Sequence, residues 1–245
     1  MSTSTMTKRI AETSPRFKAR MAGVFYLLTG TTYGVGQLLI PGKLIVDGNA
    51  VATANSILAH QPLLRSAFAA DLISVASSIV LTVLFYDLFK PVNRTLSLTA
   101  AFVHLVGLAV AAIGSFLLLA PLVVLGSEQY LTVFKVEQLQ ALAYIFLQLN
   151  AQAWNDVFMV FFAIYAILIG YLTFRSFFLP RIIGVLMALA GLGYLTLLYA
   201  PLADYLHPYN LAPGALGETS LILWLLVMGV NAQRWKEQAS TSGEW

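Results

Sequence analysis

Long apolar stretches separated by short polar segments dominate the pattern of this chain. A helix needs about 20 mostly apolar residues to cross the hydrocarbon core of a membrane. Proline or a basic residue stands at several of the ends, as at Pro41, Lys90 and Pro180. The pattern therefore predicts six transmembrane helices, near Met21–Ile40, Ser66–Phe89, Thr95–Leu125, Asn155–Phe174, Arg181–Ala200 and Ala215–Ala232.

Two shorter segments between these spans have an amphipathic pattern. Ala50–His60 follows Asn49, a residue type that favours helix N-caps. Glu137–Asn150 alternates aliphatic residues with glutamines. We expect both segments to be short helices on the outer side of the membrane. Because no glycine or proline separates the second segment from the fourth span, a single helix over Glu137–Phe174 is an open alternative.

The basic residues are divided unevenly between the two ends of the predicted spans. Of the 14 Lys and Arg residues, only Lys43, Arg65 and Lys135 fall in the outer connections. The positive-inside rule places the richer side in the cytoplasm. The sequence thus predicts an all-α six-transmembrane-helix bundle with both termini inside. We divide it into a cytoplasmic tail (1–20), a transmembrane domain (21–235) and a second cytoplasmic tail (236–245).

The composition supports a membrane protein and excludes several other classes. Hydrophobic residues make up 59% of the chain and charged residues 10%, whereas a soluble domain carries roughly 25% charged residues. No cysteine is present, which excludes thiol catalysis. The net charge of +3 is not gathered on a basic face that nucleic acid would need. The expected partner is the lipid bilayer, and the expected location is the inner (plasma) membrane.

Three acidic residues lie near the outer ends of the helices that run inward: Asp71, Asp156 and Glu218. Asp71 and Asp156 each precede the next cytoplasmic basic residue by 19 positions, which is about 28 Å of helix. Asp71 begins a polar stripe with Ser74 and Ser78, and such stripes face the interior of a bundle. We expect the three acids to line one outward-facing pocket.

Other polar residues extend this candidate site. Tyr33, Gln37 and Gln152 lie at a similar depth and are further candidates for ligand binding. His104 lies near the middle of the third span, where a lone histidine more often hydrogen-bonds a neighbouring helix than binds a metal. The acids can carry protons or bind a cation, and no spacing motif assigns a metal or cofactor. An alternative is that they lie among lipid headgroups or pair with Arg65.

Small residues in two spans are candidates for close helix packing. Gly30 and Gly34 form a G-x-x-x-G pair in the first span, and Gly107 and Ala111 form a similar pair in the third. Close approach of two backbones is the usual reason for such pairs. We therefore expect another helix to lie against each of them.

Four segments carry a resemblance to a known family. They begin at Arg20, Phe89, Gly170 and Gly217, and the most specific is the turn Tyr-Leu-Thr-Phe-Arg-Ser-Phe-Phe-Leu-Pro-Arg that ends at Arg181. Together they resemble a bacterial membrane family catalogued as domain of unknown function 4386. The resemblance implies an α-helical membrane protein, with Asp71 and Glu218 at positions that match the family pattern, and no named activity. This chain departs from the family after Phe161-Phe162, where Ile164-Tyr165 replaces a histidine.

Three functions are compatible with this pattern. The first is a membrane protein whose outward-facing polar pocket binds or moves a small amphiphile or an ion such as a proton or other cation. The second is an intramembrane enzyme that acts on a lipid or isoprenoid by carboxylate acid–base chemistry. The third is a structural or regulatory subunit of a membrane complex. The carboxylates at one depth and the long outer connections favour the first.

Overall fold

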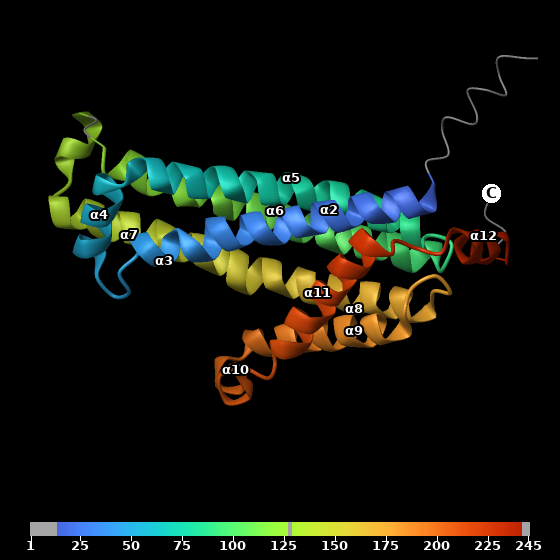
Figure 1. Ribbon diagram of the computed structural model, residues 1–245. Helices are drawn as coiled ribbons and strands as arrows, with labels where there is room; N and C mark the ends of the chain where they lie inside the picture. Colours follow the sequence, from blue (N-terminus) through green and yellow to red (C-terminus); the bar gives the residue numbers. More distant parts are fainter. Residues whose placement is uncertain (1–13, 127–128, 242–245) are drawn as a thin grey trace, which may run out of the picture. The chain divides into compact units, whose positions relative to one another are not determined.

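The computed structural model describes residues 14–126 and 129–241, a part of the chain that is helical nearly throughout (Figure 1). Residues 1–13 and 242–245 of the two predicted tails lie outside it. The α-helices are α2 (Pro15–Tyr33), α3 (Pro41–Leu44), α4 (Ala50–Ala59), α5 (Gln61–Phe89), α6 (Arg94–Val124), α7 (Val136–Gln152), α8 (Met159–Arg175), α9 (Arg181–Leu195), α10 (Ala200–Leu206), α11 (Ala212–Val227) and α12 (Ala232–Thr241). Between them are the π-helical segments η1 (Gly34–Leu39) and η3 (Ala153–Phe158) and the 3₁₀ segments η2 (Gln129–Val133) and η4 (Thr196–Leu198).

Several of these helices can cross a membrane. Gln61–Phe89, Arg94–Val124, Val136–Arg175 and Arg181–Leu198 are each long and apolar enough. The helices α11 and α12 are bent by 105° at the break between them. Together they are apolar enough to provide a fifth candidate, if the pair forms one broken span. The protein is therefore an all-α, multi-pass membrane protein with four or five candidate spans in its described residues.

Both predicted amphipathic segments are helical. Asn49 is the N-cap of α4, and its Oδ1 accepts the N–H of Ala52 at 2.9 Å. The second segment, α7, continues through η3 into α8, so that Val136–Arg175 is one helix of 40 residues. This confirms the alternative of a single helix, as the absence of glycine and proline allows. Within this region α7 packs against α4.

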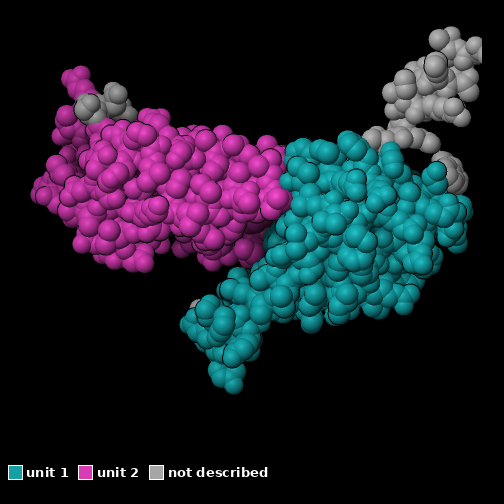
Figure 2. All heavy atoms as spheres, in the orientation of Figure 1, with its two compact units in different colours: residues 1–26, 80–104, 162–245 teal, residues 27–79, 105–161 magenta. Residues whose placement is uncertain are grey.

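The contacts divide the chain into two compact units (Figure 2). Unit 1 comprises residues 1–26, 80–104 and 162–245, and unit 2 comprises residues 27–79 and 105–161. The described Lys and Arg residues belong to unit 1, apart from Lys43, Arg65 and Lys135 in unit 2. The three basic residues that the sequence assigns to the outer connections thus share one unit.

Unit 1 has a core of aromatic and aliphatic side chains. Tyr26, Phe85 and Phe89 are buried there together with leucines and isoleucines of α8, α9 and α11. The backbones of α8 and α9 are in direct contact, since a Cβ added at Gly170 or Gly184 would overlap the backbone of the other helix. Such contact is typical of membrane helices, which associate through small residues.

Unit 2 has an aliphatic core and its own glycine contacts. The core consists of Ile40, Leu44, Ile57, Leu64, Ala67, Leu118 and Leu147. A Cβ added at Gly107 would lie 2.8 Å from the Cβ of Phe161, so the close approach predicted for this glycine is confirmed. In contrast, a Cβ at Gly30 or Gly34 meets nothing within 4 Å. The prediction for that pair was wrong for the described chain, because both glycines lie on an open face of their helical segment.

Candidate functional site

Asp71 is the most deeply buried of the acidic candidates. It lies on α5 in unit 2, and none of its surface is exposed. Its Oδ2 accepts a hydrogen bond of 2.5 Å from Nε2 of Gln37, which belongs to η1. Its other oxygen, Oδ1, is buried and has no hydrogen-bond partner. A buried polar atom without a partner is rare in native structures and calls for an explanation.

A serine on α6 also faces the carboxyl group of Asp71. The side chain of Ser115 is completely buried and interacts with this carboxyl. The Ser115 hydroxyl also lies 3.0 Å from the carbonyl oxygen of Ala111, to which it donates. A hydroxyl has one hydrogen and can accept further hydrogen bonds through its oxygen. With its hydrogen directed to Ala111, the oxygen of Ser115 is suited to accept a hydrogen bond from a protonated Asp71.

A glycine makes room for the carboxyl group. Gly36 lies in η1, and a Cβ at this position would overlap Oδ1 of Asp71. The π-helical geometry is visible in the bond from the N–H of Ile40 to the carbonyl of Val35, 3.2 Å long and five residues back. Single π-turns inside helices are frequent at functional sites. Here the π-turn places the side-chain amide of Gln37 and the backbone of Gly36 against the carboxyl group of Asp71.

The polar stripe predicted along α5 is buried. Ser74 donates to the carbonyl oxygen of Thr29 at 3.1 Å, and Ser78 donates to the hydroxyl of the same threonine at 3.3 Å. Both serines are 2% exposed. The stripe therefore faces α2 inside unit 2, which confirms the prediction of an inward-facing row that begins at Asp71.

Asp156 and Gln152 have a different environment from Asp71. Both side chains are exposed on unit 2, in η3 and at the end of α7. The same helix instead directs Trp154 and Asn150 inward. Asn150 donates to the carbonyl of Gly114 at 2.9 Å, and the ring of Trp154 lies 5.4 Å from that of Tyr33.

Glu218 has partners of its own in unit 1. The hydroxyl of Tyr194 on α9 donates to its Oε1 at 2.5 Å. The hydroxyl of Tyr26 on α2 also interacts with this carboxyl group. Gly214, one turn earlier on α11, leaves room for Tyr194, because a Cβ there would overlap the tyrosine hydroxyl. Two tyrosines thus hold Glu218 between three helices.

His104 is buried in unit 1 and bonded to a neighbouring helix. Its Nδ1 lies 2.8 Å from the hydroxyl of Thr82 on α5. Its ring stacks on Tyr165, with 4.0 Å between the centroids and 12° between the planes. The predicted interhelical hydrogen bond is confirmed. In the part of the chain that the structure describes, no three His, Asp or Glu side chains form a group that could hold a metal ion.

The structure thus joins some of the predicted candidates and separates others. In unit 2 it joins Asp71 to Gln37 and places Tyr33 against a tryptophan, while Gln152 and Asp156 are on the surface. Neither Ser115 nor Asn150 is among the site residues predicted from the sequence. Asn150 follows the buried Ala143 and Leu147 at helical spacing, so its position was readable from the pattern. Ser115 likewise follows the buried Leu108 and Ala111 of α6 at helical spacing, but nothing in the pattern indicates that it faces Asp71.

One comparison with known proteins identifies the family of this chain. The model of the family described as domain of unknown function DUF4386 matches residues 21–229. The chain therefore belongs to this family, as the resemblance of its sequence segments predicts. No curated protein and no solved structure matches the chain.

Proposed function

We propose that this protein is a six-span membrane protein that binds and moves a small ion, with Asp71 as the binding group and a proton as the ion. The observation that carries the proposal is the Oδ1 of Asp71, which is buried without a partner in a helix able to cross a membrane. An ionised carboxylate with an unsatisfied oxygen is costly in such a place. Intramembrane carboxyl groups of this kind are typical of proton relays and ion pathways.

The surroundings of Asp71 favour a proton over a metal cation. Gln37 supplies one donor to the carboxyl group, and the hydroxyl of Ser115 is turned toward the carbonyl of Ala111. A protonated Oδ1 can donate, whereas an ionised one can only accept. The close approach of Gly36 to Oδ1 also leaves little space beside this oxygen. A proton on Oδ1 turns this oxygen into a hydrogen-bond donor and needs no additional space beside it.

Proton movement into lipid vesicles tests this function. We expect vesicles that contain the full chain to take up protons under an imposed potential, faster than protein-free vesicles. Asp71→Asn should reduce this rate to the protein-free level. Asp156→Asn is the matched control, because its carboxyl group is exposed in the same unit, and it should keep the rate. Sodium uptake that depends on Asp71 would show that the transported ion is sodium and not a proton. No difference between Asp71→Asn and the wild type for either ion would refute the proposal.

The topology that belongs to this proposal has both termini in the cytoplasm and the Asp71 end of α5 facing outward. The uneven distribution of basic residues supports it, as does the helical run of α2, η1 and α3 over the predicted first span. Because the chain has no cysteine, single cysteines placed after Arg94 and after Trp235 report directly on the two sides. Both should be protected from a membrane-impermeant label in intact cells, and labelling of either would contradict the topology.

A further inference from the structure

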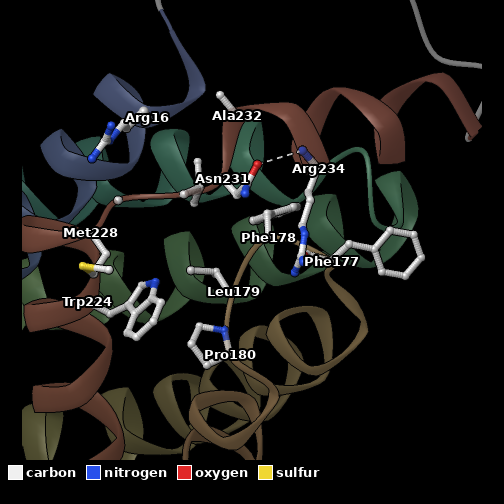
Figure 3. Close-up of a pocket in the computed structure, with 12 residues that line it drawn as sticks. Arg16, Phe177, Phe178, Leu179, Pro180, Trp224, Met228, Asn231, Ala232 and Arg234 are labelled. Atoms are coloured by element: carbon white, nitrogen blue, oxygen red, sulfur yellow. Dashed lines mark hydrogen bonds between the residues drawn. The ribbon is translucent and has the colours of Figure 1, made fainter.

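A groove in unit 1 combines two arginines with aromatic and aliphatic walls (Figure 3). Its volume is about 700 Å³, and it is bordered by α2, the turn between α8 and α9, and the connection from α11 to α12. Arg16 and Arg234 line it together with Trp224, Met228 and Phe177, and none of its lining residues is acidic. We call this hollow the arginine groove. Its size is within the range of small-molecule sites, about 300–1,000 Å³.

The local backbone explains why this hollow exists. Gly229 ends α11 with a φ of +66°, and its N–H bonds to the carbonyl of Trp224 at 2.9 Å. This left-handed turn is a common helix end and favours glycine. The chain then bends by 105° into α12, which is held by a hydrogen bond of 2.9 Å from the indole of Trp235 to the carbonyl of Leu88. The bend leaves the space between the two helices open.

Among the described residues, no ion pair neutralises the arginines of the groove. In the described ranges the ion pairs are those of Lys18 and Lys90 with Asp87, and neither groove arginine takes part in one. Arg234 has only a long contact of 3.5 Å to the carbonyl of Phe177. In the view of Figure 3, Arg16 and Arg234 lie on either side of the segment that carries Asn231. Two unpaired guanidinium groups across a concave surface are suited to bind an anion.

The start of α12 adds to this preference for an anion. Asn231 accepts the N–H of Arg234 at 3.1 Å, while the first N–H groups of a helix have no partners within it. Such a helix end favours a negative charge. An acidic residue of α12, Glu237, lines a neighbouring hollow together with Arg181 and Arg234, where the arginines outnumber it.

An apolar hollow continues from the arginine groove along the surface. It has a volume of about 430 Å³ and shares Pro180, Trp224 and Met228 with the groove. Its other walls are Ser220 and apolar side chains of α9 and α11, among which Ile182 and Val227 are both 64% exposed. A ligand that places an anionic group in the arginine groove can therefore lay an apolar chain in the adjoining hollow.

We propose that this composite surface binds an anionic phospholipid, with the headgroup phosphate in the arginine groove and an acyl chain along α9 and α11. The charge of the groove selects an anion, and the apolar hollow selects a molecule with a hydrocarbon chain. Arginine pairs with phosphate through two parallel hydrogen bonds, and basic pockets at helix ends are a known type of headgroup site. This binding does not depend on the role of Asp71, which lies in unit 2.

Lipid binding to the purified full chain tests the headgroup site. In detergent, we expect phosphatidylglycerol to bind with higher affinity than zwitterionic phosphatidylcholine, as measured by native mass spectrometry. The double variant Arg16→Gln/Arg234→Gln should lower the phosphatidylglycerol affinity by about tenfold. Arg94→Gln is the matched control, because Arg94 is an exposed arginine of unit 1 that does not line the groove. Equal affinity of the double variant and the wild type would overturn the proposal.

A second pair of variants tests the acyl-chain site and stays informative if the arginine variants do not fold. Val227→Trp fills the apolar hollow and should weaken phosphatidylglycerol binding several-fold. Leu216→Trp, an exposed leucine of α11 outside the hollow, should not. Glycerol phosphate, which has the headgroup without the chain, should compete poorly. Equal effects of the two tryptophan variants, or full competition by glycerol phosphate, would overturn the assignment of an acyl chain.

Discussion

Two acidic residues on apolar helices, Asp71 in unit 2 and Glu218 in unit 1, have very different partners. Both oxygens of Asp71 are buried, but only Oδ2 has a donor, the amide of Gln37. Glu218 is only partly buried, accepts a hydrogen bond from the hydroxyl of Tyr194 and interacts with that of Tyr26. The two residues match the same family pattern and share a predicted depth, so the sequence alone predicts the same role for both. The structure distinguishes them by the donors around each carboxyl group.

This difference assigns different roles to the two acids. The carboxyl group of Glu218 on α11 accepts a hydrogen bond from Tyr194 on α9 and interacts with Tyr26 on α2, and none of its oxygens is buried without a partner. That arrangement stabilises the packing of unit 1. The free oxygen of Asp71 needs a proton or another ligand from outside the chain. A satisfied carboxyl group thus acts as a structural link, whereas an unsatisfied one is the better candidate for binding.

The largest expected effect comes from removing the space that Asp71 occupies. In Gly36→Ala the added Cβ overlaps Oδ1 of Asp71, so the carboxyl group or η1 must move, at a cost of about 3 kcal/mol in the free energy of unfolding. Gly34→Ala is the control in the same π-helical segment, since nothing lies within 4 Å of its added Cβ. That change should be neutral or stabilise by about 0.5 kcal/mol. Denaturant titration in detergent measures both, and equal values would contradict the close approach.

A somewhat smaller effect is expected when Asp71 loses the amide donor of Gln37. Gln37→Leu leaves Oδ2 without a partner as well, which should cost about 2 kcal/mol in the same titration. Gln152→Leu changes an exposed glutamine of unit 2 and should stay within about 0.5 kcal/mol of the wild type. The cost of Gln37→Leu should shrink when Asp71→Leu is also present, since no buried acceptor is then left. An unchanged cost in the double variant would show that the two side chains are not coupled.

The smallest effect is expected at Glu218. Tyr194→Phe removes the hydroxyl that donates to Glu218, but the nearby Tyr26 and partial exposure to solvent compensate, so we expect a loss of about 1 kcal/mol. Tyr199→Phe, whose ring is 64% exposed, should be nearly neutral. If Tyr194→Phe lowered the free energy of unfolding as much as Gln37→Leu, the proposed difference between Glu218 and Asp71 would be contradicted.

Much of the fold can be predicted from the sequence because lipid imposes a simple pattern. Apolar helices, their ends at Pro180 and Lys90, and the N-cap at Asn49 all follow from residue type and spacing. The burial of the stripe from Asp71 to Ser78 follows from the same reasoning. These features depend on local sequence and on the cost of polar groups in hydrocarbon, which is why one chain suffices to predict them.

The partners of the candidate residues are not predictable in this way. Asp156 and Asp71 have similar helical depth in the sequence, yet Asp156 is exposed, because η3 and α7 direct Trp154 and Asn150 inward instead. Gly30 lies on an open face, whereas Gly36, six positions later, is in close contact with Asp71. Gly36 lies in a π-helical segment that no residue pattern predicts. Such choices depend on which helices become neighbours.

Infrared difference spectroscopy of Asp71 tests the central claim most directly. A protonated carboxyl group has a carbonyl stretch that is distinct from the bands of an ionised carboxylate. At neutral pH, we predict that the spectrum of the wild-type protein minus that of Asp71→Asn contains this protonated band, and that the wild type minus Asp156→Asn does not. A wild type minus Asp71→Asn spectrum that contains only ionised carboxylate bands would contradict the proposal that Asp71 holds a proton.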